Sequence, residues 1–284
     1  MTTKKKKMAH LVIAGAVAGG IALLVFFIMN FGQIGTDDAY VEGRIHIIAS
    51  KIPGTVKTVN AKDNQIVKAG DLLVEIDPAD YELRLAEAKA SVDTRKAAFE
   101  QAGRDKDRAE ALYKEKVFPK ERYENALTAF NLAKAQCEAA EAQCGIARRN
   151  LEYTQISAPS DGHVARKSVE AGNQIQPAQG LMAVVGNDMW VVANFKETEL
   201  THMRPGQKVE IKVDTYPGKV FKGHVDSIQR GTGAKFSMFP PENAAGNFVK
   251  VVQRIPVKIV FDENMNEKYP LSIGMSVVPK VKVR

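Results

Sequence analysis

A seven-residue apolar repeat between Pro78 and Tyr153 constrains this chain more than any other feature of its sequence. In the second half of the segment the repeat has two rows. The first row is Tyr123, Phe130, Cys137, Cys144 and Leu151, and the second is Ala126, Ala133, Ala140 and Ala147. Two rows offset by three residues form the a/d seam along which one helix packs on another. The pattern therefore predicts an α-helical hairpin over residues 78–153.

The first half of the segment carries a less regular version of the same seam. Its rows are Leu85, Val92, Phe99 and Tyr113, broken at Lys106, beside Ala88, Arg95, Ala102 and Ala109. We expect Asp77 to cap the first helix and Pro78 to take its first position. Val117-Phe118-Pro119 interrupts the pattern where a turn is needed. At about 1.5 Å per residue each arm is roughly 50–60 Å long, so we expect the hairpin to project.

The N-terminal residues have the composition of a membrane anchor. Lys4 to Lys7 precede residues 8–31, which lack Asp, Glu, Lys and Arg and are long enough to cross about 30 Å of hydrocarbon as a helix. A cleaved signal peptide is the alternative, but its apolar region is shorter and ends in small residues, whereas Phe26-Phe27-Ile28-Met29 stands here. The lysines predict a cytoplasmic basic tail at 1–7 and the bulk of the chain outside.

We therefore expect a single-pass protein of the inner membrane, held in the lipid bilayer by residues 8–31. In a Gram-negative bacterium its bulk would lie in the periplasm. The net charge of +7 fits this topology better than nucleic-acid binding. Four of those charges come from Lys4 to Lys7, and the hairpin carries 14 acidic and 14 basic residues, interleaved as on a solvated helix surface. No basic groove with interleaved aromatic residues is evident, so nucleic acid is not an expected partner.

The chain has two cysteines, Cys137 and Cys144. They are two helical turns apart on one face, about 10.5 Å between Cα atoms, which is too far for a mutual disulfide. No His, Asp or Glu shares their row, so a metal site is not expected. We interpret both as small seam residues, and pairing with a neighbouring subunit in an oxidising compartment stays open.

Residues 49–76 match residues 157–184 at a constant offset of 108. Gly54 corresponds to Gly162, and Leu73 to Leu181. Each copy alternates apolar residues around glycine-containing turns, which is typical of short strands. Neither copy can bury both faces of its own sheet, so we predict that the two pack together as one small β-sandwich, with the hairpin inserted between them.

The C-terminal segment reads as strands. The runs 208–214, 219–228 and 254–261 alternate apolar and polar residues between Gly- and Pro-containing turns. This pattern predicts a small antiparallel β-barrel over 190–284, which the strand lead-in at 36–48 joins.

Particular motifs resemble a known family. Gly54 and 70–73 in the first copy, with 158–159 and 161–162 in the second, resemble a lipoyl or biotinyl carrier domain split by an inserted coiled coil. That arrangement is the one found in the HlyD family of membrane fusion (periplasmic adaptor) proteins. The stretches 36–41, 190–198, 204–207, 231–233 and 243–254 resemble the EmrA-like branch of that family. The likeness covers essentially the whole chain.

The resemblance implies a mixed α and β, multi-domain protein. Its parts would be an N-terminal transmembrane helix, a split lipoyl-like β-sandwich (halves 49–77 and 154–186), a coiled-coil hairpin (78–153) and a C-terminal antiparallel β-barrel with a membrane-proximal region. It implies the adaptor subunit of a tripartite multidrug efflux system. Such a subunit forms a homo-oligomer and links a major-facilitator transporter of the inner membrane to a TolC-like outer-membrane channel.

Residues for catalysis or cofactor binding are not evident. A carrier domain presents one lysine at a tight hairpin tip, and the helical insertion occupies that position here. The sequence contains no phosphate-binding G-x-x-x-x-G-K-[ST] loop and no G-x-S-x-G nucleophile elbow. The five histidines are isolated in sequence. We therefore expect no enzyme activity, no cofactor and no metal.

The family's channel-docking motif at the hairpin tip is an arginine, a leucine four residues later and a serine seven residues after that. Arg108 and Leu112 have the first spacing, but Pro119 stands at the serine position. Arg108 and Leu112 are equally well explained as an ordinary surface cation and a seam residue. Val117 and Phe118, with Pro119, are expected to contact the channel because exposed apolar residues at the end of a projecting arm often mark an interface.

Asp37, Asp38 and Tyr40 are expected near a partner transporter because they closely follow the predicted anchor. Three other functions stay open. The chain would instead serve an ABC-type exporter of peptides or proteins if it works with an ATPase. It would be a coiled-coil envelope scaffold if it has no transport partner. A carrier-domain enzyme subunit would carry a lipoyl or biotinyl adduct.

Overall fold

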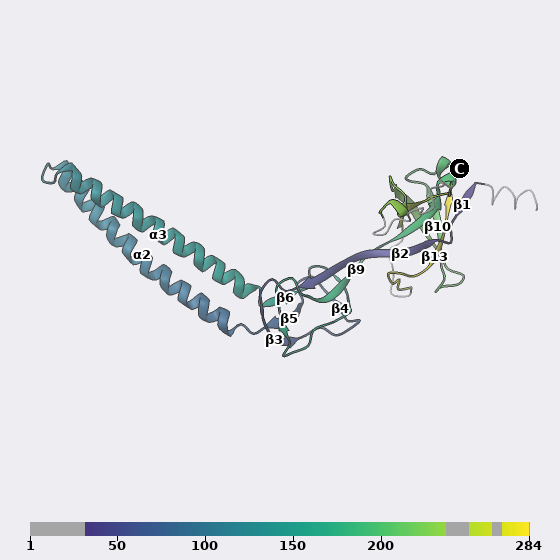
Figure 1. The fold of residues 1–284 in the computed structure, drawn as a ribbon, viewed down its shortest axis with the longest axis horizontal. Helices are drawn as coiled ribbons and strands as arrows, with labels where there is room; N and C mark the ends of the chain where they lie inside the picture. The colour runs from purple at the N-terminus through teal and green to yellow at the C-terminus, as the bar shows by residue number, and fades with distance from the viewer. Residues whose placement is uncertain (1–31, 237–249, 263–268, 284) are drawn as a thin grey trace, which may run out of the picture. The chain divides into compact units, whose positions relative to one another are not determined.

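The computed structural model describes residues 32–236, 250–262 and 269–283. The predicted basic tail and membrane helix, residues 1–31, lie outside these ranges. None of the helices in the described ranges has the length and apolar character needed to cross a membrane. The described residues divide into two compact units, one formed by Ile45–Asn187 and the other by the described residues before Ile45 together with those from Asp188 onward. Two long strands, β2 (Ala39–Ala49) and β9 (Gly180–Lys196), contribute to both units (Figure 1).

The hairpin of the first unit consists of α2 (Ala79–Lys114) and α3 (Lys120–Glu152). Pro78 takes the N-cap position, so the helix begins one residue later than we predicted. Asp77 still satisfies the end of the helix, because its Oδ1 accepts a hydrogen bond of 3.1 Å from the Ala79 N–H. The turn lies where the sequence requires it, between Lys114 and Lys120.

The two sequence repeats fold into equivalent strands. The first copy forms β3 (Gly54–Val59), β4 (Ile66–Val67) and β5 (Leu72–Ile76). The second copy forms β7 (Gly162–Ala165), β8 (Gln174–Ile175) and the start of β9. Strand β6 (Gln155–Ser157) pairs with β5 beside the base of the hairpin. Equivalent strands begin at the same offset of 108, so the repeat in the sequence is a repeat in the structure.

The copies exchange strands with each other. Gly54 of β3 pairs with Ile175 of β8, and Val67 of β4 pairs with Gly162 of β7. The two pairs are equivalent, because Gly162 is the counterpart of Gly54 in the repeat and Ile175 is the counterpart of Val67. One hydrophobic core, which includes Leu73 and Leu181, is drawn from both copies. The prediction that the two copies pack as one sandwich is confirmed.

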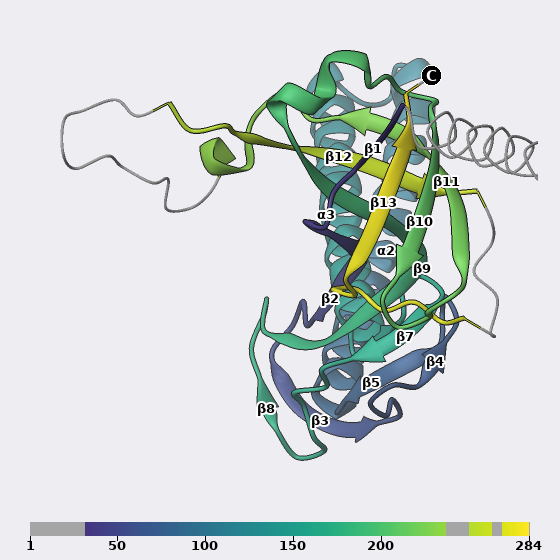
Figure 2. The same cartoon turned by 90° about the vertical axis from the view of Figure 1, so that its right-hand side faces the viewer.

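The second unit is an antiparallel β-barrel. Its strand order is β1 (Gln33–Gly35), β13 (Val277–Lys282), β10 (Lys208–Val213), β11 (Val220–Ile228), β12 (Arg254–Phe261) and then β9. Figure 2 shows β13, β10 and β11 side by side. Two short 3-10 helices, Glu197–His202 and Gly233–Phe236, follow β9 and β11. The core contains Phe195, Ile211 and Ile259. Observed strands β10, β11 and β12 coincide within one residue with the alternating runs in the sequence.

Candidate functional site

The hairpin tip is a tight turn with a defined hydrogen-bond pattern. The Val117 N–H donates to the Leu112 carbonyl at 2.9 Å, and the Lys116 N–H donates to the Tyr113 carbonyl at 2.9 Å. These two bonds form a Schellman motif, which satisfies carbonyl groups at a helix C-terminus. Lys116 has φ of 62°, the left-handed conformation that this motif needs and that usually falls to glycine. Pro119, with φ of −67°, then caps α3 without a side-chain hydrogen bond.

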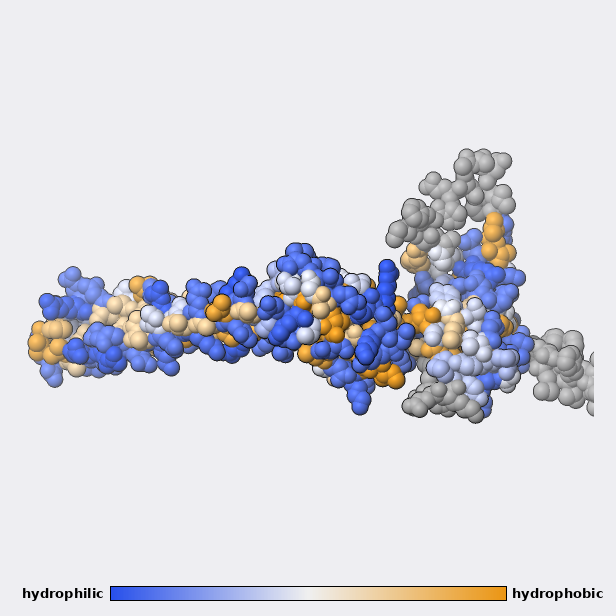
Figure 3. Space-filling view, turned by 90° about the horizontal axis from the view of Figure 1, so that it is seen from below, coloured by the Kyte–Doolittle hydropathy of each residue, from blue (hydrophilic) through white to orange (hydrophobic). Residues whose placement is uncertain are grey.

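The turn exposes apolar side chains. Val117 is 61% exposed, and Phe118 is half-buried beneath the Arg122 guanidinium, 5.1 Å from its ring centre. Tyr113 and Tyr123 stack one turn further down, with ring centres 5.6 Å apart. Figure 3 shows a hydrophobic surface at the far end of the hairpin. Stacked rings hold the two helix ends together beneath an exposed apolar tip.

Arg108 and Leu112 lie one helical turn apart, on the arm that leads to the tip. Arg108 is exposed and its Nη1 lies 3.4 Å from Oδ1 of Asp105. Leu112 is half-buried, and its carbonyl accepts hydrogen bonds from the N–H groups of both Val117 and Phe118. Leu112 therefore supports the turn itself, while the Arg108 side chain is accessible to a partner.

The least exposed face of α3 coincides with the predicted seam. Cys137 and Cys144 are each 7% exposed and both are free thiols. Tyr123, Phe130 and Leu151 are half-buried. Burial of small side chains here lets the two helices approach closely. The seam positions serve packing, and neither thiol is presented to solvent.

The break in the first arm's seam has a structural explanation. Lys106 stands where an apolar residue is expected, and its Nζ lies 4.8 Å from the ring centre of Phe130 and 3.0 Å from Oδ1 of Asp107. Phe99 packs on the same Phe130, with ring centres 5.1 Å apart. The Lys106 ammonium therefore interacts with the Phe130 ring and a carboxylate at the same time, which explains how a lysine is accommodated at this seam position.

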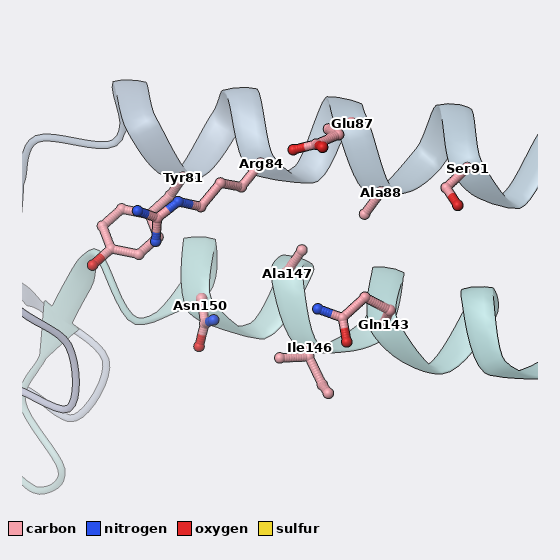
Figure 4. A pocket seen from close by; sticks show the side chains of 9 residues that line it. All are labelled: Tyr81, Arg84, Glu87, Ala88, Ser91, Gln143, Ile146, Ala147 and Asn150. Atoms are coloured by element: carbon pink, nitrogen blue, oxygen red, sulfur yellow. The ribbon is translucent and has the colours of Figure 1, made fainter.

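A groove of about 500 Å³ runs between the two helices near their base. Figure 4 shows Arg84 and Glu87 of α2 above Gln143 and Asn150 of α3, with Ala88 and Ala147 leaving the space between them. Tyr81 closes one end of the groove, and its hydroxyl donates to the Pro53 carbonyl at 2.6 Å. This bond ties the base of the hairpin to the sandwich. Sequence analysis missed the groove, because it depends on which small residues face each other across the seam.

The barrel places the three expected transporter-proximal residues differently. Asp37 is exposed and Tyr40 is 39% exposed. Asp38 is engaged inside the unit: one carboxylate oxygen lies 3.3 Å from Nη1 of Arg254, and the other accepts from the Asn194 amide at 3.0 Å. Asp38 therefore joins β9 and β12, which leaves Asp37 and Tyr40 accessible. The Asn194 and Arg254 partners were not found from sequence, since they lie 156 and 216 residues away.

Within the described ranges, no three His, Cys, Asp or Glu side chains gather in a way that would hold a metal ion. The pKa shifts found have an ordinary surface cause. For example, a hydrogen bond from Lys114 lowers the pKa of Glu110. Such i, i+4 pairs support an exposed helix and do not indicate acid–base chemistry.

Two family models match the chain over nearly its whole length. One describes the barrel-sandwich hybrid domain of RND membrane fusion proteins and matches residues 44–187. The other describes an AAEA-like β-barrel domain and matches residues 188–281. The two matches meet at the point where the chain passes from one compact unit to the other.

Several known proteins are similar to most of the chain. Multidrug export protein EmrA of Haemophilus influenzae is 34% identical over 99% of this chain and 85% of its own length. EmrA of Escherichia coli is 36% identical over 87% of this chain and 75% of its own. Fatty acid resistance protein FarA of Neisseria gonorrhoeae is 35% identical over 98% and 83%.

Solved structures share the fold. The membrane fusion protein Spr0693 of Streptococcus pneumoniae aligns with a TM-score of 0.66 and 16% identity, over 88% of this chain and 98% of its own. MacA of Actinobacillus actinomycetemcomitans aligns with a TM-score of 0.63 and 23% identity, over 89% and 80%. Sandwich, inserted hairpin and barrel together define a membrane fusion protein, or periplasmic adaptor. Within that class, the chain belongs to the EmrA-like branch of the HlyD family.

Proposed function

We propose that this chain is the periplasmic adaptor of a tripartite multidrug efflux system. The observation that carries the proposal is its similarity, over nearly its whole length, to multidrug export proteins that are 34–36% identical. In this role the chain supplies no energy and catalyses no reaction. It forms a homo-oligomer that aligns and seals a conduit between an inner-membrane transporter of the major-facilitator type and a TolC-like outer-membrane channel.

The hairpin tip is the proposed contact with the channel. Pro119 offers no hydroxyl at the position where the family motif has serine, and its backbone is used to begin α3. The exposed side chains of Val117 and Arg108, with Phe118 at the edge of the turn, are then the groups that reach the channel. An apolar contact at the tip would be bordered by charged residues that keep the free hairpin soluble.

The inner-membrane end of the system is assigned to the second unit. Residues 8–31 would hold the chain in the bilayer with its bulk in the periplasm, as their apolar composition favours. Asp37 and Tyr40 would face the transporter, because they follow closely on that anchor and their side chains are accessible.

In-cell photocrosslinking tests the proposal. A probe at Lys116, Val117 or Lys120 should capture an outer-membrane channel, and a probe at Asp37 or Tyr40 should capture a multi-span transporter. Lys89, which is exposed on α2 well away from the tip, provides a matched control that should capture neither. Deletion of the gene should lower resistance to exported compounds, and the plasmid-borne gene should restore it.

Other adducts would point to the alternative functions. Base probes that capture a transporter with an ATPase subunit would indicate an ABC-type exporter. Tip probes that capture only copies of this chain, with unchanged resistance on deletion, would indicate a coiled-coil scaffold of the envelope and would overturn the efflux role.

A further inference from the structure

We propose that one face of the β-barrel docks on the anionic phospholipid headgroups of the membrane that holds the chain's own N-terminal segment. This basic face consists of five lysines on three neighbouring strands: Lys208 and Lys212 of β10, Lys222 of β11, and Lys280 and Lys282 of β13. The proposal rests on the anchoring of residues 8–31 put forward above.

Strand register brings the five lysines together. Glu210 of β10 pairs with Lys222 on one side and with Lys280 on the other, so these three residues form one row across the sheet. Lys208 and Lys212 lie two residues before and after Glu210, on the same face of β10. Lys282 lies two residues beyond Lys280 on β13. Because β11, β10 and β13 lie side by side (Figure 2), the register makes these lysines neighbours in the sheet although they span 75 residues of sequence.

The barrel core fixes the direction in which these lysines point. The residues that alternate with them, among them Val209, Ile211, Phe221 and Val281, are buried in the core of the barrel. Rotating any of the three strands to bury its lysines would expose that core. The basic face is therefore a constant feature of the folded barrel.

Positive charge on this face is largely uncompensated. The outward positions of β10, β11 and β13 carry two acidic residues, Glu210 and Asp226, and the Asp226 carboxylate lies 4.0 Å from Nζ of Lys258 on β12. Lys282 binds Glu210 with an Nζ–Oε1 distance of 2.6 Å and lowers the pKa of that carboxyl. No described carboxylate lies within ion-pair distance of Lys208, Lys212, Lys222 or Lys280. A surface with this charge attracts anions.

The position at which the chain enters the barrel indicates that the basic face binds lipid headgroups. The predicted membrane segment ends at Phe31, and Gln33 begins β1, which pairs with β13 at Lys282. Strands are about 4.8 Å apart, so β10 lies about 10 Å from β1, comparable with the Debye length of about 8 Å at physiological ionic strength. Lysines this close to a bilayer are attracted to anionic headgroups.

The register also predicts an order of contact. Lys282 and Lys208 lie in the row of Gln33, next to the chain's exit. Lys280 and Lys222 lie two residues further along their strands, about 7 Å away, and Lys212 lies about 14 Å away. Headgroups should therefore cover Lys282 and Lys208 most and Lys212 least.

Lysine footprinting of the full chain in nanodiscs tests the proposal. An amine-acylating reagent is applied in phosphatidylcholine discs and in discs that also contain phosphatidylglycerol, and each lysine is read by mass spectrometry. We expect acylation of Lys282 and Lys208 to fall about threefold or more with the anionic lipid and to recover at 1 M salt, where the Debye length is about 3 Å. Lys89 and Lys134 on the hairpin should not change. Inorganic phosphate added to phosphatidylcholine discs should not reproduce the protection.

A triple variant, Lys208→Gln with Lys212→Gln and Lys222→Gln, should lose at least half of the lipid-dependent protection of Lys280 and Lys282. The matched control replaces three exposed hairpin lysines, Lys89, Lys96 and Lys134, with Gln and should keep it. Equal acylation of all five face lysines in both kinds of disc would overturn the proposal while leaving the adaptor function intact. Protection that appears only with a purified transporter would assign the face to a protein partner instead. Failure of the chain to enter discs at all would refute the anchoring, which is a separate result.

Discussion

Gly162 of β7 stands where the backbone of its neighbour leaves no room for a side chain. A Cβ at this position would lie 2.2 Å from the carbonyl oxygen of Val185 and 2.9 Å from its carbonyl carbon. Carbon–oxygen contacts in sheets are about 3.3 Å or longer, so Gly162→Ala requires β7 and β9 to separate by about 1 Å. Both partners are backbone atoms in the middle of a sheet, and neither can rotate away. By analogy with overpacked cores we expect a loss of about 2–3 kcal/mol.

Gly145 of α3 is the matched control. Nothing lies within 4 Å of a Cβ added there, and the residue is helical. Gly145→Ala should therefore stabilise the hairpin by about 0.5–1 kcal/mol, the usual difference between glycine and alanine in a helix. The same chemical change thus has opposite signs at the two positions.

Hydrogen exchange followed by mass spectrometry measures both effects in the intact chain. It reports the opening free energy of each segment, which a single melting temperature of a multi-unit protein does not. Faster exchange in β4, β7 and the start of β9 is expected for Gly162→Ala, and slower exchange in α3 for Gly145→Ala. If Gly162→Ala changes the opening free energy by less than about 0.5 kcal/mol, the sheet accommodates a methyl group and our steric argument is wrong.

Three further predictions concern the hairpin and the barrel. Lys116→Gly removes a lysine in the left-handed conformation and should raise the opening free energy of the hairpin tip by about 0.5–1 kcal/mol, which appears as slower exchange. An unchanged opening free energy would mean that the turn is unstrained. Phe130→Ala removes the ring that Phe99 contacts and should lower the opening free energy of the hairpin by about 2–3 kcal/mol in the same assay. Unchanged protection of the hairpin amides would contradict this prediction. The pKa of Glu210 is lowered by Lys282, so the stability from this exposed pair is present at neutral pH and lost as the pH falls through the lowered pKa. Lys282→Gln should raise that pKa toward its usual value in a carboxyl NMR titration, and an unchanged titration would contradict the assignment.

Local sequence patterns were enough to predict much of the fold. The hairpin and its turn follow from a seven-residue spacing and one proline, both of which act over a few residues. The offset of 108 relates β3, β4 and β5 to β7, β8 and the start of β9, because equivalent sequences adopt equivalent strands. The alternation at 208–214 and 254–261 likewise marked β10 and β12 to within a residue.

Contacts between residues that are distant in sequence could not be predicted from the sequence. Nothing near Asp38 indicates that Asn194 and Arg254 will engage it, because those pairings depend on which strands become neighbours. The left-handed conformation of Lys116 was also missed, since lysine gives no signal for it and glycine would have. The basic face belongs to the same class: its five lysines are unremarkable along the chain and meet through strand register alone.

The exchange of strands between the two repeats has a consequence for how the chain is made. The first copy is complete in sequence at Ile76, and its β3 pairs there with β5, yet β4 and the start of β3 pair with β7 and β8, about a hundred residues later. A chain emerging from a translocation pore therefore exposes the apolar side of its first copy until the second copy arrives. The hairpin between them uses local contacts and can form during that interval. When the hairpin is folded, its two ends lie together, which allows Glu75 of β5 and Gln155 of β6 to pair directly. A folded hairpin therefore shortens the effective connection between the two copies and lowers the entropy cost of pairing them.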